Sequence, residues 1–194
     1  MPVDFLTDEQ YQFYAKYPAT LTKEQLNKYF YLDDKDKELI NACRRDYNQL
    51  GYALQLTTLR FLGTFVPNPI DVPREVVNYI AKQLAIELPV ELECYMDRKA
   101  TRSVHCTEIK TLFYYQDLNG IWGYRLTRWL YSQAWFGNER PSILFERCTL
   151  WLLSRKVLLP GISYAQWIIC KLICAVVTYM LCKVSAGVIR ALNY

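Results

Sequence analysis

Apolar residues recur at the spacing of an α-helix through most of the chain, and this pattern predicts an all-α fold. The clearest segment covers residues 50–65, where one helix face must be buried. The apolar positions of that face are Leu50, Ala53, Leu54 and Phe61. The strongest helical pattern lies in residues 142–156, after a proline at a first-turn position. The sequence shows no series of strands and hairpins and no internal repeat, so helices alone are expected to build the core.

Capping residues and prolines set the expected helix boundaries. Thr22 with Gln25 three residues later is a capping-box signal, and Asp33 begins a further helix. The helical pattern weakens between Leu88 and Glu93, which we interpret as a boundary between two small helical subdomains. The predicted organisation is therefore one subdomain at residues 1–88, a second at 93–165 and an apolar C-terminal helix at 166–194.

The segment Arg44–Gln49 joins the helix that begins at Asp33 to the helix from Leu50, and the pair has the proportions of a helix-turn-helix unit. Arginines such as Arg44 and Arg45 suit phosphates, whereas the amides of Asn48 and Gln49 can pair with the edge of adenine. The helix from Leu50 is too apolar to lie freely in a major groove. We therefore expect that helix in the core and the preceding turn towards a partner. A solvated connection without DNA contact is the alternative.

Two further groups of basic residues are candidates for phosphate binding. Arg98, Lys99 and Arg102 lie at an expected helix start and are followed by His105. The alternatives are an exposed basic loop and, for His105, a packed or capping histidine. Arg125 and Arg128 lie three residues apart on one helix face and alternate with aromatic residues. That pattern suits a nucleic-acid backbone, but it is also typical of an amphipathic helix that faces a core.

The charge of the chain is unevenly distributed. The formal net charge is +4, yet residues 1–40 carry five lysines against eight acidic residues. The remainder of the chain is therefore basic, with a net charge of +7. A basic charge over residues 41–194 permits binding to a polyanion such as DNA, but it does not establish such binding.

The cysteines and the single histidine argue against a metal site. Seven cysteines occur, none of them in a Cys-x-x-Cys pair, and His105 is the only histidine of the sequence. Zinc sites need paired ligands at short spacing, so neither a metal nor another cofactor is expected. The sequence begins without a secretory signal, which predicts reduced thiols and a cytoplasmic location.

Three ordered stretches of the sequence resemble the N-terminal region of the Tn-three family of transposases. The first carries the family's Arg-Arg, Asn, Leu-Gly-Tyr-Ala-Leu-Gln-Leu and Leu-Arg-Phe-Leu-Gly pattern within residues 44–63. The second comprises Tyr95, Arg98, Thr101-Arg102, His105 and Glu108-Ile109. The third runs from Arg140-Pro141 to Pro160-Gly161, so the resemblance covers residues 4–165.

This resemblance implies an all-helical module that binds double-stranded DNA at the terminal inverted repeats of a mobile element during replicative transposition. Together with the basic and amide residues proposed above, the predicted DNA-binding residues are Arg44, Arg45, Asn48, Gln49, Arg98, Lys99, Arg102, His105, Arg125 and Arg128. An intact transposase or a second copy of the chain is a further expected partner. A helical protein–protein interaction module is the alternative function.

No motif for catalysis is visible in the sequence. It has no phosphate-binding glycine loop, no Gly-x-Ser-x-Gly elbow and no His-Glu-x-x-His pair. In the Tn-three family the carboxylates of the two-metal reaction lie in a separate domain further along the chain. The resemblance therefore implies a truncated fragment without enzymatic activity.

The C-terminal segment is strongly apolar from residue 167 to residue 184. Its length approaches that of a membrane span, but Lys171 and Lys183 lie within it and oppose insertion. We expect self-association through this segment, with a small membrane-associated protein as the alternative.

Overall fold

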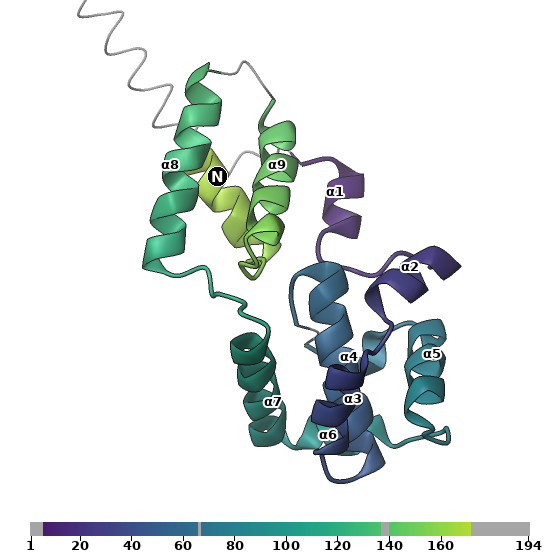
Figure 1. Cartoon of the computed structure of the whole chain (residues 1–194). Coiled ribbons are helices and arrows are strands. Elements are labelled where there is room, and N and C mark those ends of the chain that lie inside the picture. Colours follow the sequence, from purple (N-terminus) through teal and green to yellow (C-terminus); the bar gives the residue numbers. More distant parts are fainter. Residues whose placement is uncertain (1–5, 66, 137–139, 172–194) are drawn as a thin grey trace, which may run out of the picture. The chain divides into compact units, whose positions relative to one another are not determined.

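The structure, a computed structural model, describes residues 6–65, 67–136 and 140–171 (Figure 1). The secondary-structure elements of these residues are helices, which confirms the predicted all-α fold. They are α1 (Asp8–Phe13), α2 (Lys23–Tyr29), α3 (Asp34–Asn41), α4 (Asp46–Leu62), the 3₁₀-helix η1 (Pro69–Asp71), α5 (Arg74–Leu84), α6 (Leu92–Asp97), α7 (Lys99–Leu112), α8 (Gly120–Phe136) and α9 (Pro141–Ser154). Residues 162–171 are helical as well.

The chain forms two compact units, and each is described by itself. Ala15–Gln116 make one, here called the central unit. The segment before Ala15 and the residues from Asp117 onward make the other, here called the terminal unit. This division differs from the predicted boundary at residues 88–93, because α6 and α7 pack against α4. Tyr95 of α6 and Ile109 of α7 are fully buried, so the central unit continues past the weak helical pattern.

Helix α4 is the centre of the central unit, where it contacts α2, α3, α5, α6, α7 and η1 (Figure 1). It is buried on all sides from Leu50 to Leu59, as expected for a core helix. The closest approach is at Gly51, where an added Cβ would lie 2.6 Å from ring carbons of Tyr95. Glycine is therefore what allows the backbone of α4 to rest on that ring.

The start of α4 differs from the prediction. We expected residues 46–49 to form a turn, but the helix begins at Asp46. Arg45 takes a positive φ of 74°, and its carbonyl accepts hydrogen bonds from the amides of Asn48 (3.0 Å) and Gln49 (3.1 Å). These two bonds close the first turn of α4 four residues earlier than the apolar pattern indicated. A connection of four residues, 42–45, then separates α3 from α4, and the helix-turn-helix interpretation stays a prediction.

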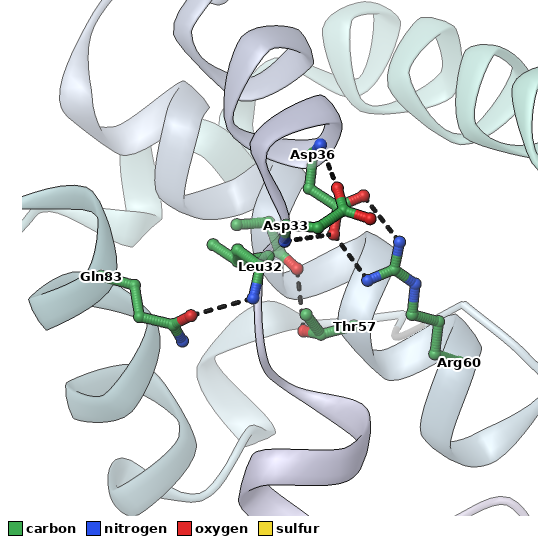
Figure 2. Close-up of polar contacts among 7 residues, drawn as sticks. Leu32, Asp33, Asp36, Thr57, Arg60 and Gln83 are labelled. Carbon is green, nitrogen blue, oxygen red and sulfur yellow. Dashed lines mark hydrogen bonds and ion pairs between the residues drawn. The ribbon is translucent and has the colours of Figure 1, made fainter.

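A capping box and a buried ion pair hold α3 against α4 (Figure 2). The Asp33 carboxylate accepts from the amide of Asp36 at 2.7 Å, and the Asp36 carboxylate accepts in return from the amide of Asp33 at 3.1 Å. Both oxygens of Asp36 also accept from the guanidinium of Arg60, at 2.6 and 2.7 Å. The Asp36 side chain is 1% exposed and that of Arg60 25%, so this bidentate pair is largely removed from water.

The terminal unit has a separate core, in which α8, α9 and the helix at residues 162–171 meet. Its buried residues are Leu126, Leu130, Phe145, Cys148, Trp151, Leu152, Val157, Leu159, Ala165, Ile168 and Ile169. The segment before Ala15 joins this core through Tyr14, whose hydroxyl donates to the Pro160 carbonyl at 2.8 Å, and through Tyr11, which bonds Gln166.

The predicted boundary at residue 166 is therefore not a structural one. Ile168 and Ile169 are core residues of the terminal unit, because the helix that carries them packs with α8 and α9. The rest of the predicted apolar helix, residues 172–194, lies outside the described residues. Within the described part of the chain, no helix combines the length and the apolar character that a bilayer crossing requires.

Candidate nucleic-acid interface

The connection between α3 and α4 presents two exposed arginines, Arg44 and Arg45. The positive φ of Arg45 turns the chain sharply just before Asp46, a conformation that few residues other than glycine adopt. The Arg45 guanidinium then returns over its own helix. Its Nη1 donates to the hydroxyl of Tyr47 at 2.7 Å, and its Cζ lies 5.8 Å from the centroid of that ring.

Asn48 and Gln49, the two predicted base readers, direct their amides at the backbone of this connection. Asn48 Nδ2 donates to the Arg44 carbonyl at 2.8 Å, and Gln49 Nε2 donates to the Cys43 carbonyl at 3.0 Å. Asn48 is only 9% exposed, and its Oδ1 is buried without a hydrogen-bond partner among the described residues. Both side chains therefore fix the path of the segment that carries the arginines.

The second predicted basic segment begins at the junction of α6 and α7. Arg98 is the last residue before α7, and its Cζ lies 5.9 Å from the centroid of the Tyr47 ring. Lys99 is the exposed first residue of α7. Tyr47 thus brings together two basic segments that the sequence separates widely. We call the surface formed by Arg44, Arg45, Tyr47, Arg98 and Lys99 the Tyr47 surface.

Arg102 has a different place from its neighbours. It is half-buried, and its Nη1 donates to the Pro67 carbonyl at 3.1 Å and lies 3.3 Å from the sulfur of Met96. These contacts tie the first turns of α7 to the segment before η1. Arg102 therefore holds the start of α7, which Lys99 begins.

Two features favour an anion at the Tyr47 surface, although Asp46 and Asp97 adjoin its arginines in sequence. Within the described ranges, Arg44, Arg45, Arg98 and Lys99 have no carboxylate oxygen within ion-pair distance. In addition, α4 and α7 both begin here, and neither has a side chain that caps its first amides. The first amides of a helix point outward unbonded and carry the positive end of its dipole. This arrangement is suited to bind an anion, phosphate above all.

His105 lies in the core beneath this surface, which corrects its prediction as a DNA-contacting residue. The side chain is 8% exposed, and its Nδ1 lies 3.2 Å from the Tyr95 hydroxyl. Its ring contacts those of Tyr95 and Tyr52, with centroids 5.7 and 5.1 Å apart. Its Nε2 lies 3.9 Å from the sulfur of Cys43, next to the arginines. The histidine of α7 therefore contacts α4, α6 and the connection between α3 and α4, and it does not face a ligand.

The burial of His105 predicts a specific pH dependence of stability. Desolvation lowers the pKa of His105 from its ordinary value of 6.5, although the charge of Glu108 opposes the shift. Below pH 6.5 the unfolded chain takes up a proton that the folded chain refuses, so stability falls as the pH decreases through this window. We expect a slope no steeper than about 1.4 kcal/mol per pH unit.

Urea unfolding at several pH values between 5 and 7.5 measures this effect. The control is the variant His105→Gln, in which the slope between pH 6.5 and 5.5 should flatten because the chain has no other histidine. Identical slopes in the two proteins would contradict the role of His105.

Arg125 and Arg128 belong to the terminal unit, so they form a surface of their own. Both are exposed on α8, and the Cζ of Arg125 lies 4.8 Å from the centroid of the Trp122 ring. Tyr124 and Ile121 are exposed on the same helix, whose sequence contains no acidic residue. Tyr124 therefore lies with the two arginines on the exposed side of α8, whereas Trp122 and Trp129 pack against the core of the terminal unit.

Sequence reasoning did not single out Tyr47 and Arg60. Tyr47 lies within the predicted basic turn, and an aromatic residue two positions after an arginine was the signal available. Arg60 lies in the pattern shared with transposases, but its partner Asp36 is distant in sequence, so only the fold reveals the pair.

These features define an all-helical module of two units, one of which carries a basic surface at two helix starts. The chain belongs to the family described as "Domain of unknown function (DUF4158)", whose model matches residues 5–172. The match extends through residues 166–171, in agreement with their place in the core.

The curated relatives named below are transposases, which confirms the resemblance. The chain is 46% identical over 162 residues to the transposase for transposon gamma-delta from Escherichia coli (strain K12), covering 83% of this chain and 16% of that protein. It is 31% identical over 161 residues to the transposase for transposon Tn1546 from Enterococcus faecium, covering 82% and 16%. The transposase for transposon Tn501 from Pseudomonas aeruginosa is 33% identical over 90 residues. The chain thus spans about one sixth of the length of its first two relatives.

Proposed function

We propose that this chain binds double-stranded DNA and recognises the terminal inverted repeats of a mobile element in replicative transposition. Its role is binding, in the cytoplasm, and the cleavage and joining of DNA belong to other parts of the related transposases. The observation that carries the proposal is the meeting of Arg45 and Arg98 at Tyr47, which concentrates unpaired positive charge at two helix starts.

The residues at the Tyr47 surface have two different roles in this proposal, phosphate binding and support of the backbone. Arg44, Arg45, Arg98 and Lys99 neutralise phosphates, since they are exposed and have no ion-pair partner within the described ranges. Asn48 and Gln49 hold the backbone that carries the arginines, because their amides are bonded to it. Phosphate contacts of this kind position a protein on DNA without reading its sequence.

A second candidate surface lies on α8 of the terminal unit. Arg125 and Arg128 are exposed there beside Trp122 and Tyr124, a combination that tracks a sugar–phosphate backbone. The terminal unit would then make phosphate contacts of its own.

Replacing Arg44 and Arg45 by alanine is expected to weaken DNA binding about tenfold or more at low salt. Both a duplex carrying an end of the gamma-delta transposon and a duplex of random sequence should be affected, because phosphates are common to both. The log–log dependence of affinity on salt should become shallower by up to about 1.8, at roughly 0.9 for each phosphate that the variant no longer neutralises. Fluorescence anisotropy with labelled duplexes measures both quantities.

The matched control removes the same charge elsewhere in the central unit. Lys23 and Lys35 are exposed on α2 and α3, so the double variant Lys23→Ala, Lys35→Ala keeps the Tyr47 surface intact. Its affinity should change less than threefold. An unchanged chain that shows no salt-dependent binding, or a control that weakens as much as the arginine variant, would refute the proposal.

A protein–protein contact is a second candidate function, and one groove favours it. A groove of about 320 Å³ lies between α1 and α9 in the terminal unit, with Phe13 and Leu150 exposed at its edges. Apolar side chains exposed beside a groove are typical of docking surfaces for other proteins. Analytical ultracentrifugation of the chain alone tests for self-association, and Leu150→Glu should abolish any that depends on this groove.

A further inference from the structure

The ring of Tyr47 has two cationic neighbours from separate segments of the central unit. The Arg45 guanidinium comes from the connection before α4 and the Arg98 guanidinium from the connection before α7, with Cζ-to-centroid distances of 5.8 and 5.9 Å. Because both distances end at one ring centroid, the two Cζ atoms are no more than about 12 Å apart, and like charges at such a range repel one another. Such an arrangement is favourable when an aromatic ring partly compensates the charges, and more so when an anion lies between them.

We infer that Tyr47 joins Arg45 and Arg98 into one clamp that takes a single phosphate group of a nucleic-acid strand. The inference rests on the proposed function and deepens it, because it assigns both arginines to the same phosphate. Tyr47 is a positioning residue in this clamp: its hydroxyl accepts one N–H of Arg45, and the other N–H groups of that guanidinium stay available to the ligand.

Neighbouring acids do not already fill the clamp. Asp46 follows Arg45 and Asp97 precedes Arg98 in sequence, but no ion pair links either acid to these arginines in the described part of the chain. The backbone also favours a phosphate. The first amides of α4 and of α7 lack side-chain caps, and Arg45 and Arg98 are the residues immediately before these two helices. The positive ends of the helix dipoles therefore add to the charge of the two guanidinium groups.

The salt dependence of binding to a 30-base-pair random duplex distinguishes a shared phosphate from two separate ones. If Arg45 and Arg98 share a phosphate, either one alone still neutralises it. Arg45→Ala and Arg98→Ala should then each leave the log–log salt slope unchanged, and the double variant should reduce it by about 0.9. Two separate phosphates would give a reduction of about 0.9 for each single variant and about 1.8 for the double variant, which would overturn the clamp.

Variants of Tyr47 test its part in the clamp. Tyr47→Leu removes the ring, so the effects of the two arginine substitutions should become additive and affinity should fall about fivefold. Tyr47→Phe keeps the ring, so in this variant each single arginine substitution should still leave the log–log salt slope unchanged. Arg44 is the matched control, because no contact joins it to Tyr47 among the described residues. The effects of Arg44→Ala and Arg98→Ala on the log–log salt slope should therefore be additive, whichever residue occupies position 47. If the effects of the two arginine substitutions remain non-additive in the Tyr47→Leu protein, the inference is wrong.

A titration with inorganic phosphate separates failure of the clamp from failure of the proposed function. Nitrogen-15 NMR follows the Nε signals of Arg45 and Arg98 in the whole chain. Both signals should respond with one dissociation constant in the unchanged chain and with two different constants in Tyr47→Leu. A chain that does not bind duplex DNA but shows this joint response would refute the proposed function and leave the clamp standing. Independent responses in the unchanged chain would refute the clamp itself.

Discussion

Gly51→Ala is expected to destabilise the central unit by about 3 kcal/mol, as overpacking of a rigid core does. The new Cβ would lie 2.6 Å from ring carbons of Tyr95, and the ring is fully buried, so it has no space to move away. The cost should far exceed the ordinary gain of replacing a helical glycine by alanine. Urea unfolding followed by circular dichroism measures the change in the free energy of unfolding.

Gly123→Ala is the matched control for this substitution. Gly123 lies inside α8, and a Cβ added there meets no atom within 4 Å. This variant should stabilise the terminal unit by about 0.5–1 kcal/mol, because alanine has less backbone freedom to lose on folding. Equal effects of the two substitutions would mean that α4 does not rest on the Tyr95 ring.

Arg60→Met is expected to cost about 3–5 kcal/mol of stability, the effect of removing one partner from a buried ion pair. The substitution leaves the Asp36 carboxylate 1% exposed and without its cation, although the capping bond from the Asp33 amide would remain. Chemical unfolding of the whole chain measures this destabilisation in the transition of the central unit.

The converse substitution should be milder. In Asp36→Asn the remaining charge is that of Arg60, which is 25% exposed and can reach water. We therefore expect a decrease in stability about half as large. Arg74→Met, which removes an exposed arginine from α5, should change stability by less than about 0.5 kcal/mol. A destabilisation by Arg60→Met as small as that by Arg74→Met would contradict the importance of the buried pair.

Signals that act within one turn of helix were predictable from the sequence. The capping box of Thr22 and Gln25 is present, with the Thr22 hydroxyl accepting from the Gln25 amide at 3.2 Å. Asp33 caps α3 in the same manner. The apolar spacing predicted one buried face on the helix from Leu50, and the burial of that helix on every side, Gln55, Thr57 and Thr58 included, goes beyond this prediction.

Features that depend on distant residues were not predictable. The weak pattern at residues 88–93 indicated a domain boundary, but the fit of Tyr95 against Gly51 keeps α6 in the central unit. The start of α4 was misplaced because the apolar pattern carries no sign of the positive φ at Arg45. The basic segments at Arg45 and Arg98 were identified separately, and only the fold shows that they meet at Tyr47.

The site residues illustrate the same distinction. A sequence does not show whether a basic residue is exposed or buried, so the prediction grouped His105 with the exposed arginines. Its burial among Tyr52, Tyr95 and Cys43 arises from packing between α4, α6, α7 and the connection before α4. The amides of Asn48 and Gln49 resembled base readers for a similar reason, since their backbone partners belong to a connection whose path the sequence does not specify.

Hydrogen–deuterium exchange of the chain bound to a duplex tests the central claim most directly, because it locates the contact without altering a residue. The duplex carries an end of the gamma-delta transposon, and exchange is compared with that of the free chain. The account predicts protection of the amides at residues 46–47 and 99–101, the uncapped starts of α4 and α7, while exchange in α2 and α5 stays unchanged. A duplex that binds tightly but leaves these helix-start amides exchanging at their free rates would contradict the assignment of the Tyr47 surface as the DNA interface.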